Sequence, residues 1–331
     1  MNANTRPPRP PRQPRRALHG VLLLDKPIGF TSNDALQVAK RLFRAEKAGH
    51  TGTLDPMATG LLPLCFGAAT KFSQVSLDSD KRYVATLALG ATTSTGDREG
   101  EVLLERPVDT SIDRIRAACR AHSGEIDQVP PMHSALKHQG KALYEYARQG
   151  VEVERETRRI TIHSIDIVSW HDRELVIDVT CTKGTYVRTL AETIGEMLGC
   201  GAHLAALRRV QCGPLLLTQA CTLDQLETLD ETARDELLQP ADALVADWPA
   251  VKLGPEDAGR FLSGMRRRVS LADAPRVRVF GPGQGGSPAF LGSGRVTAGE
   301  LIADRLLSPL EVASLVPEAP TMALFKQVRL Q

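Results

Sequence analysis

Long apolar segments are missing from this chain of 331 residues. Near the N-terminus the longest uninterrupted apolar run is Val21 to Leu24. A membrane-spanning helix needs about 20 apolar residues, and the apolar core of a secretory signal needs roughly 7 to 15. We therefore expect a cytoplasmic protein that does not enter a membrane.

Paired cysteines and metal-ligand clusters are also missing. The six cysteines are scattered, no two of them form a CxxC pair, and no histidine cluster has metal-ligand spacing. Reduced, mostly buried thiols are the expectation for such a pattern, and no metal site is predicted. The cysteines are Cys65, Cys119, Cys181, Cys200, Cys212 and Cys221.

A strong overall charge is absent, because the formal net charge is only +2. The charges are nevertheless unevenly distributed. Residues 2–16 carry five Arg and no acid, residues 221–250 carry eight acids and a single Arg, and residues 251–331 carry 11 basic and seven acidic side chains. Residues 17–220 therefore balance to zero. A nucleic-acid surface would have to be a patch made by folding, supplemented by a basic tail.

Composition divides the chain into three parts. Residues 1–16 are low-complexity Pro and Arg and predict a disordered tail. Residues 17–250 hold the longer periodic elements. From residue 251 the sequence changes to short strands and Gly/Pro turns, which predicts a small β-barrel up to residue 331.

Hydrophobic periodicity predicts alternating strands and helices in the central part. HGVLLLDKP reads as a strand that ends at Pro27, and Ser32 is the expected N-cap of the helix that follows. KRYVATLALG alternates strictly and predicts a strand that begins near Tyr83. Further along we expect a helix capped by Ser111, two paired strands, and a helix with one apolar stripe that stops at Gly199.

The loop GHTGTLDPMATG, residues 49–60, combines three glycines with a single carboxylate before a proline. Two interpretations are open. Asp55 could be a helix N-cap with Pro56 at the first helical position, which needs no chemistry. Alternatively, His50, Thr51, the tight glycines and Asp55 form an active-site loop.

Residues 130–159 interrupt the regular pattern with Pro, Gly and a one- to two-turn helix. Basic residues there outnumber four Glu, and Tyr144 and Tyr146 lie among them. Basic side chains interleaved with aromatic ones suit contact with an RNA backbone and its bases. A solvated amphipathic excursion is the alternative. Tyr186 and Arg188 lie where a strand turns into a helix, a common place for a presented side chain.

Five motifs in order and at suitable spacing closely resemble the bacterial tRNA pseudouridine-55 synthases of the TruB family. One such motif is weak, whereas five in register are highly specific. The resemblance is strong over roughly residues 18–250 and weak in the C-terminal part. The motifs are GVLLLDKPIGFTSNDAL (20–36), GHTGTLDPMATGLLPLCFG (49–67), LDSDKRYVATLALG (77–90), SALKHQGKALYEYARQG (134–150) and CTKGTYVRTLAETIGEMLGCGAHLAALRR (181–209).

The resemblance implies an α+β pseudouridine synthase fold, with a mixed, mostly antiparallel central sheet and flanking helices. It also implies a thumb-like insertion at residues 130–159 and a small C-terminal PUA-like RNA-binding β-barrel. The implied reaction isomerises uridine-55 in the T-loop of tRNA to pseudouridine, with base flipping and without cofactor or metal. The implied partner is the T-arm of tRNA, no protein partner is implied, and a monomer is expected.

Catalytic roles follow from the motif positions. Asp55 matches the family's catalytic aspartate, which attacks C1′ or C6 or acts through a glycal-forming path. Tyr83 matches the tyrosine that stacks on the flipped base. Arg188 matches the arginine that pairs with the aspartate and keeps it ionised.

Supporting roles are implied in the same way. Tyr186 and Leu207 match residues packed around the uracil, and His50 matches the residue that braces the space left by the extruded nucleotide. Lys26 and Pro27 belong to a motif that supports the loop. The thumb side chains expected to contact RNA are Lys137, Lys141 and Arg148.

Departures from the family pattern are few. His133 stands where an aromatic residue, usually Tyr, is expected, and residues 281–290 are an extra loop. Three rival functions remain: an RNA-folding chaperone, which could coexist with catalysis, the guide-RNA-dependent relative found in archaea and eukaryotes, and a two-carboxylate glycoside hydrolase. The last needs a second placed acid, for which Asp97 is the candidate.

Overall fold

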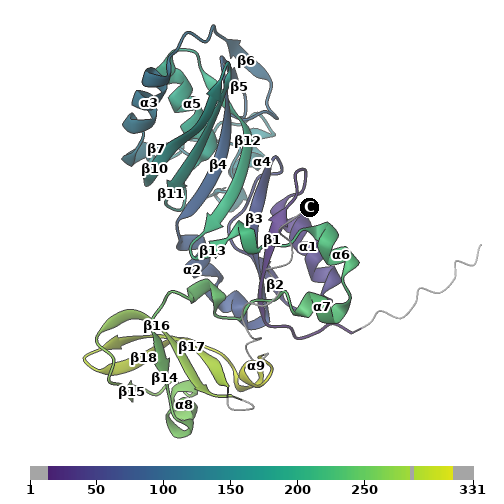
Figure 1. The fold of residues 1–331 in the computed structure, drawn as a ribbon, viewed down its shortest axis with the longest axis vertical. Helices are drawn as coiled ribbons and strands as arrows, with labels where there is room; N and C mark the ends of the chain where they lie inside the picture. The colour runs from purple at the N-terminus through teal and green to yellow at the C-terminus, as the bar shows by residue number, and fades with distance from the viewer. Residues whose placement is uncertain (1–13, 284–286, 316–331) are drawn as a thin grey trace, which may run out of the picture.

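The computed structural model describes residues 14–283 and 287–315. These residues form two large sheets and two two-stranded hairpins, and Figure 1 shows how the large sheets are arranged. The predicted tail falls largely on residues 1–13, which lie outside the described part, as do residues 284–286 of the extra loop. None of the described helices is long and apolar enough to cross a membrane.

The larger sheet has nine strands, and its main path runs β1-β3-β12-β4-β11-β10-β7. Strand β2 adds to β3, and β13 adds to β12. All pairings are antiparallel except the one between β12 and β3. The strands are β1 (Gly20–Lys26), β2 (Ala48–His50), β3 (Ala58–Phe66), β4 (Lys81–Leu89), β7 (Gly124–Gln128), β10 (Arg158–His171), β11 (Glu174–Cys181), β12 (Ala202–Cys212) and β13 (Leu215–Leu216).

Helices and two small hairpins complete this body. The hairpins pair β5 (Ala91–Thr93) with β6 (Val102–Glu105), and β8 (Lys137–His138) with β9 (Lys141–Ala142). The helices are α1 (Ser32–Leu42), α2 (Ser73–Asp78), α3 (Ile112–Ala121), α4 (Leu143–Ala147), α5 (Val187–Leu198), α6 (Leu223–Thr228) and α7 (Glu231–Asp235), with 3-10 turns η1 (Gly67–Phe72), η2 (Leu217–Gln219) and η3 (Ala243–Val245).

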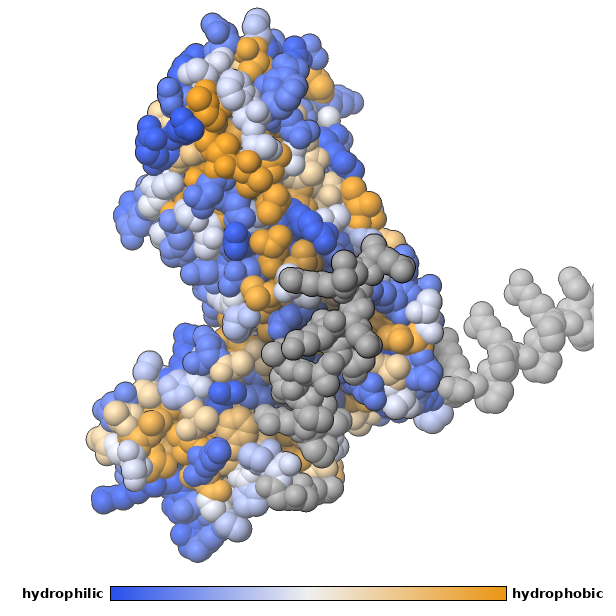
Figure 2. All heavy atoms as spheres, viewed as in Figure 1, coloured by the Kyte–Doolittle hydropathy of each residue, from blue (hydrophilic) through white to orange (hydrophobic). Residues whose placement is uncertain are grey.

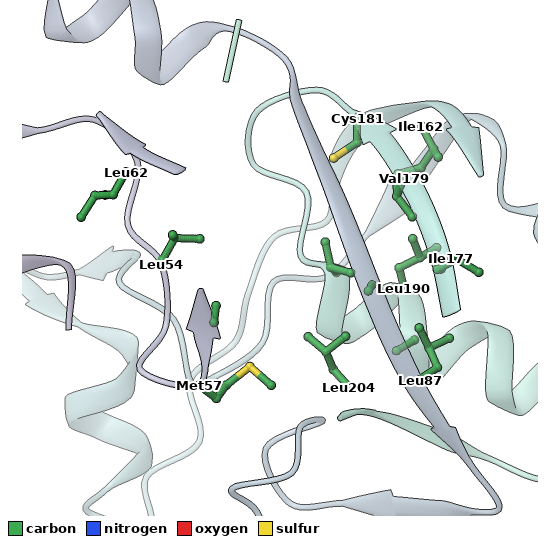
Figure 3. Packing of buried hydrophobic residues seen from close by; sticks show 14 of the residues in the cluster. Leu54, Met57, Leu62, Leu87, Ile162, Ile177, Val179, Cys181, Leu190 and Leu204 are labelled. Atoms are coloured by element: carbon green, nitrogen blue, oxygen red, sulfur yellow. The ribbon is translucent and has the colours of Figure 1, made fainter. Parts of the chain in front are cut away.

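Strand β4 and helix α5 carry the core of this body. Ala85, Leu87 and Leu89 alternate on one buried face of β4, as the pattern predicts. Leu190 of α5 belongs to the same buried cluster as Leu87, and Figure 3 shows the two near Leu204 of β12. The expected stop of α5 is also present, because Gly199 has a left-handed backbone conformation with φ 84°.

Two local predictions are wrong. Thr31, not Ser32, is the N-cap of α1, because the Asp34 amide donates to the Thr31 hydroxyl. Ser32 lies inside the first turn and its hydroxyl faces the protein interior. No helix follows Asp55 either, since the chain enters strand β3 at Ala58. The helix-cap interpretation of Asp55 is therefore excluded.

The second sheet has five strands in the order β14-β16-β17-β18-β15. The sheet is curled, and over the described residues it is open, because its end strands β14 and β15 do not pair with each other. Its elements are β14 (Ala250–Lys252), α8 (Pro255–Leu262), β15 (Arg267–Arg268), β16 (Ala274–Pro282), β17 (Pro288–Thr297), β18 (Glu300–Leu306) and α9 (Pro309–Ala313).

The second sheet packs directly on the larger body. The rings of Phe72 and Phe290 are 5.2 Å apart between centroids. Lys71 Nζ donates to a Glu311 carboxylate oxygen at 2.6 Å and to the Leu306 carbonyl at 2.9 Å. Apolar residues gather over both bodies on the face drawn in Figure 2. A shared buried cluster therefore joins two sheets that each have their own core.

Candidate active site

Asp55 lies in a loop that is anchored on both sides. Leu54 and Met57 are buried in the main core, and Figure 3 shows both to the left of Leu190 and Leu204. The Ser32 hydroxyl donates to the Leu54 carbonyl at 3.1 Å and accepts from the Leu54 amide at 2.8 Å. The Gly29 amide donates to the Pro56 carbonyl at 2.8 Å. These contacts hold the carboxylate of Asp55 in place while leaving its side chain 41% exposed.

Arg188 meets Asp55, as predicted. Arg188 lies in the first turn of α5, and its Nη2 is 3.1 Å from Asp55 Oδ2. The same nitrogen donates to the His133 carbonyl at 2.6 Å, and Nη1 donates to the Thr95 carbonyl at 3.2 Å. The guanidinium is almost fully buried. Arg188 thus connects the Asp55 loop with two other segments.

Asp97 is the second acid at this arginine. Its Oδ2 lies 3.5 Å from Arg188 Nη1, and its side chain is only 5% exposed. The other oxygen, Oδ1, accepts from the Thr95 hydroxyl at 2.6 Å and from the Glu99 amide at 3.0 Å. Both carboxylate oxygens of Asp97 therefore have partners, and the side chain helps to hold Arg188 in position. The two acids differ in exposure, and only Asp55 is open to a ligand.

Opposing effects set the acidity of Asp55. Partial burial raises the pKa of its carboxyl above the ordinary value of 3.8, and this is the largest effect. The positive charge of Arg188 lowers that pKa, as predicted, while the negative charge of Asp97 raises it. The net direction is upward, so the surroundings keep the carboxylate more basic than an exposed aspartate.

Lys26 is a buried cation at the end of β1. Its ammonium donates to the carbonyls of Pro27 and Phe30, at 3.0 and 2.6 Å. Burial lowers the pKa of Lys26 to about 8, and the charge of Asp55 opposes that change. Lys26 therefore supports the chain after β1 and places a positive charge near Asp55. Pro27 directly follows β1, and its supporting role stays a prediction.

Arg209 is a site residue that the sequence analysis missed. It is almost fully buried in β12, where its Nε donates to the Leu61 carbonyl at 2.7 Å and its Nη2 to the Gly52 carbonyl at 3.0 Å. A side chain at Gly60 would lie 2.3 Å from the Arg209 carbonyl oxygen, so only glycine fits there. The sequence signal was the LRR run at residues 207–209, but that run is distant in sequence from the glycine-rich loop, and only the pairing of β12 with β3 brings the two together.

Tyr83 lies on β4 directly opposite Arg209 of β12, and Ala85 lies opposite Leu207. Facing residues of an antiparallel pair project to the same side. Tyr83 and Leu207 therefore share the face that packs against the main core with α5. Enclosure raises the pKa of the Tyr83 phenol to about 12. No hydrogen bond joins Tyr83 to Asp55 among the described contacts, so the phenol stays on the wall of the site.

Tyr186 and His50 flank the same region. Tyr186 precedes α5, and its amide donates to Gln128 Oε1 at 2.7 Å. Burial raises the pKa of its phenol, and the charges of Arg188 and Asp55 both act on that pKa. His50 ends β2, and its Nδ1 is buried without a hydrogen-bond partner. Burial and the charge of Arg209 lower the pKa of His50, which favours a neutral imidazole.

The thumb-like segment carries the exposed basic residues. Lys137 and Lys141 lie exposed on the β8–β9 hairpin, and the Arg148 guanidinium lies over the Tyr144 ring, 5.3 Å from its centroid. The base of the thumb-like segment contacts Arg188, because the His133 carbonyl accepts a hydrogen bond from Arg188 Nη2. The departure at His133 therefore leaves this contact intact, because it uses only the backbone.

All six cysteines are free and buried, as predicted. Within residues 14–283 and 287–315, no three His, Cys, Asp or Glu side chains come together as a metal-binding group. The ionisable groups described at this site are the carboxylates of Asp55 and Asp97, the guanidiniums of Arg188 and Arg209, the Lys26 ammonium, two phenols and an imidazole.

Comparisons with known proteins agree over most of the chain. The N-terminal domain model of the TruB family pseudouridylate synthases matches residues 40–187, and the C-terminal domain model of tRNA pseudouridylate synthase B matches residues 188–246. The tRNA pseudouridine synthase B of Ralstonia nicotianae is 56% identical over 308 residues, covering 91% of this chain and 98% of the relative. Its counterpart in Burkholderia pseudomallei is 55% identical over 299 residues, covering 88% and 98%.

Solved structures agree at the level of the fold. A Cbf5-Nop10-Gar1 complex contains a chain with TM-score 0.66 and 24% identity, covering 89% of this chain and 87% of that one. The archaeal box H/ACA Nop10-Cbf5 complex gives TM-score 0.63 and 25% identity, covering 88% and 86%. Fold and sequence together define an isomerase of the pseudouridine synthase class. Within that class, the chain belongs to the TruB family.

Proposed function

We propose that this protein isomerises uridine-55 in the T-loop of tRNA to pseudouridine, with Asp55 as the catalytic carboxylate. The observation that carries the proposal is the 3.1 Å contact of Arg188 with Asp55 in an anchored loop. The relatives named tRNA pseudouridine synthase B support tRNA as the substrate class. The 56% identity to them, against 24% to the Cbf5 chain, favours them over the guide-RNA-dependent relative.

In the proposed reaction, the C1′–N1 bond breaks and a C1′–C5 bond forms. The proton on C5 leaves and N1 gains one, so atoms and charge balance without a cofactor. A carboxylate beside the ribose and base serves such a reaction as nucleophile or as stabiliser of developing positive charge. Asp55 meets this need because it is ionisable, partly exposed and held in one direction by Arg188.

The base would occupy the wall formed by Tyr83, Leu207 and Tyr186. A uracil inside a folded loop is out of reach, so the target nucleotide has to leave its stack. Tyr83 offers an aromatic face, and Leu207 an apolar edge two positions away on the neighbouring strand. His50, with its neutral and unpartnered ring nitrogen, would brace the space that the nucleotide leaves.

The thumb, residues 130–159, would clamp the T-arm, with Lys137, Lys141 and Arg148 on phosphates. The PUA-like unit, residues 251–331, would add RNA contacts to those of the catalytic domain, residues 17–250. Phosphate contacts supply most of the affinity of such complexes, while loop shape and the extruded base supply specificity. We propose that the protein acts as a monomer without a protein partner.

The test is tritium release from T-arm RNA labelled at uridine C5. We expect the wild type to release label and Asp55→Asn to release none above background, because the amide has no negative charge. Asp178→Asn is the matched control, since Asp178 also pairs with an arginine, Arg82, but on the face of β4 and β11 opposite to Tyr83. The control should keep wild-type release.

The proposal fails if the wild type releases no label, or if Asp55→Asn releases it as fast as the wild type.

The accompanying proposal, a tRNA-folding chaperone action, is tested separately by the refolding of misfolded tRNA. Binding through the thumb does not require the Asp55 charge, so Asp55→Asn should still accelerate refolding of misfolded tRNA. Loss of that effect in the inactive variant would remove the chaperone role.

A further inference from the structure

Ile28 and Phe30 are exposed apolar side chains beside the candidate active site that the reaction described so far does not use. Ile28 is 51% exposed and Phe30 is 36% exposed. Both follow Lys26 and Pro27 in the connection between β1 and α1. Exposed apolar side chains that are grouped, and not scattered singly, can mark a ligand-binding surface.

The connection that carries these two side chains is tied to the Asp55 loop at several points. The Gly29 amide, between them, donates to the carbonyl of Pro56, which directly follows Asp55. The Phe30 carbonyl accepts from the buried Lys26 ammonium at 2.6 Å. Two residues later, the Ser32 hydroxyl binds both backbone groups of Leu54. The backbone of Phe30 is thus held in register with the carboxylate.

We propose that Phe30, flanked by Ile28, stacks on the base of an unpaired nucleotide adjacent to the target uridine. This inference rests on the proposed function, because it needs a single-stranded RNA segment at Asp55. Single-stranded RNA is recognised by stacking its unstacked bases on aromatic side chains. Phe30 has no charge or hydrogen-bonding group, so the contact would favour a base without selecting its identity.

Continuity with the site favours RNA over a protein partner as the occupant. The carboxylate of Asp55 and the ring of Phe30 are both partly exposed, and their connections are joined by the Gly29–Pro56 backbone hydrogen bond, so an RNA strand bound at Asp55 would pass close to Phe30. On the thumb side, Arg188 joins Asp55 to the His133 carbonyl. Phe30 would therefore be a positioning residue that holds the strand on the side of Asp55 formed by the β1–α1 connection.

The experiment measures binding of a T-arm hairpin by fluorescence anisotropy in the Asp55→Asn background, where turnover does not interfere. The variants are Phe30→Ala, Phe30→Leu and Phe30→Trp. Leu103→Ala is the matched control, because Leu103 is an exposed apolar residue of β6, outside both the β1–α1 connection and the Asp55 loop. Each variant is also tested with hairpins in which one neighbour of the target uridine is abasic.

Loss of one stacking contact should weaken binding by Phe30→Ala roughly 5- to 150-fold. Phe30→Trp should bind like the parent, and Phe30→Leu should fall between them. The salt dependence of binding should stay unchanged, because no phosphate contact is lost. With one of the two abasic hairpins, the difference between the parent and Phe30→Ala should disappear.

Binding by Phe30→Ala within about twofold of the Leu103→Ala control would overturn the proposal. An equal loss on every hairpin, abasic ones included, would also overturn it, because Phe30 would then only support the loop. If an added protein binds at this surface and RNA does not, the stacking proposal is also overturned. Tritium release by the protein with Asp55 intact separates the two proposals. If this protein releases label and the Phe30 variants behave like the parent, only the stacking proposal is rejected.

Discussion

At the scale of single residues, Arg188 is the group on which the site depends. One guanidinium binds two carboxylates and two backbone carbonyls from three other segments of the chain. A buried arginine with this many partners fixes distances among segments that are far apart in sequence. The direction of Asp55 is therefore a property of the network rather than of its own loop.

The charge of Asp97 should be readable in the pH dependence of the reaction. Because Asp97 raises the pKa of Asp55, Asp97→Asn removes that effect and the pKa of Asp55 falls. Activity that needs the ionised carboxylate is lost as pH drops through this pKa, so the acid limb of kcat/KM should move to lower pH. The measurement is a pH profile of tritium release for the variant and the wild type.

The asparagine variant is also expected to turn over more slowly, because Arg188 loses one of its brackets. Asp178→Asn, which changes an acid outside the network, should leave both the rate and the acid limb in place. An acid limb that stays fixed, or moves to higher pH in Asp97→Asn, would show that the two carboxylates do not interact.

At the scale of elements, the thumb and the Asp55 loop differ in how they are anchored and in how far their side chains are exposed. The loop is anchored by buried side chains and backbone hydrogen bonds on both sides. The thumb instead consists of a two-stranded hairpin and the short helix α4, and most of its charged residues are exposed. The Asp55 loop is suited to hold a reacting group, and the thumb is suited to contact a large charged surface.

Reversing two thumb charges should weaken RNA binding without unfolding the protein. In the double variant Lys141→Glu with Arg148→Glu, two expected phosphate contacts are lost and replaced by repulsion. The slope of log affinity against log salt should become shallower by about one per lost contact. The measurement is filter binding of T-arm RNA at several salt concentrations.

The matched control reverses two exposed arginines on α3, Arg116→Glu with Arg120→Glu, which changes the net charge equally. Its affinity and salt slope should stay close to those of the wild type. If the thumb variant binds as tightly as the wild type at low salt, the thumb is not part of the RNA surface.

At the scale of the whole molecule, the two sheets are joined by a buried apolar cluster rather than by a loose linker. Phe290 of β17 lies between Phe72 of the larger body and Phe280 of β16, with ring centroids 5.2 and 5.6 Å away. Such packing holds the second sheet in a defined position. An RNA contacting both bodies would then meet a preformed surface.

Phe290→Ala should weaken that junction. Deleting a buried phenylalanine side chain costs about 3 to 5 kcal/mol of unfolding free energy. We expect chemical denaturation to show this loss, together with separate unfolding of the two bodies. Leu310→Ala, at an 82% exposed position of α9, is the control and should change stability by less than about 0.5 kcal/mol. Equal stability of the two variants would mean that the ring does not join the bodies.

Strands and helices such as β4 and α5 could be predicted from the sequence because their hydrophobic patterns depend only on neighbouring residues. The strict alternation of β4 and the apolar stripe and terminal glycine of α5 each reflect one face buried against a neighbour. Capping was less certain, because Thr31 and Ser32 are adjacent and both suit an N-cap. The tertiary structure distinguishes them, because the Ser32 hydroxyl is buried against Leu54 while the Thr31 hydroxyl accepts from the Asp34 amide.

The sequence by itself determined the alternation of strands and helices, the family, and the identity of Asp55, Tyr83 and Arg188 as candidates. Tertiary structure decided which groups meet. Arg188 and Asp97 come together because the first turn of α5 lies against the β5–β6 connection, and Arg209 reaches Gly52 because β12 pairs in parallel with β3. Such contacts depend on strand order and register, and no periodicity in the sequence encodes the distance between two segments.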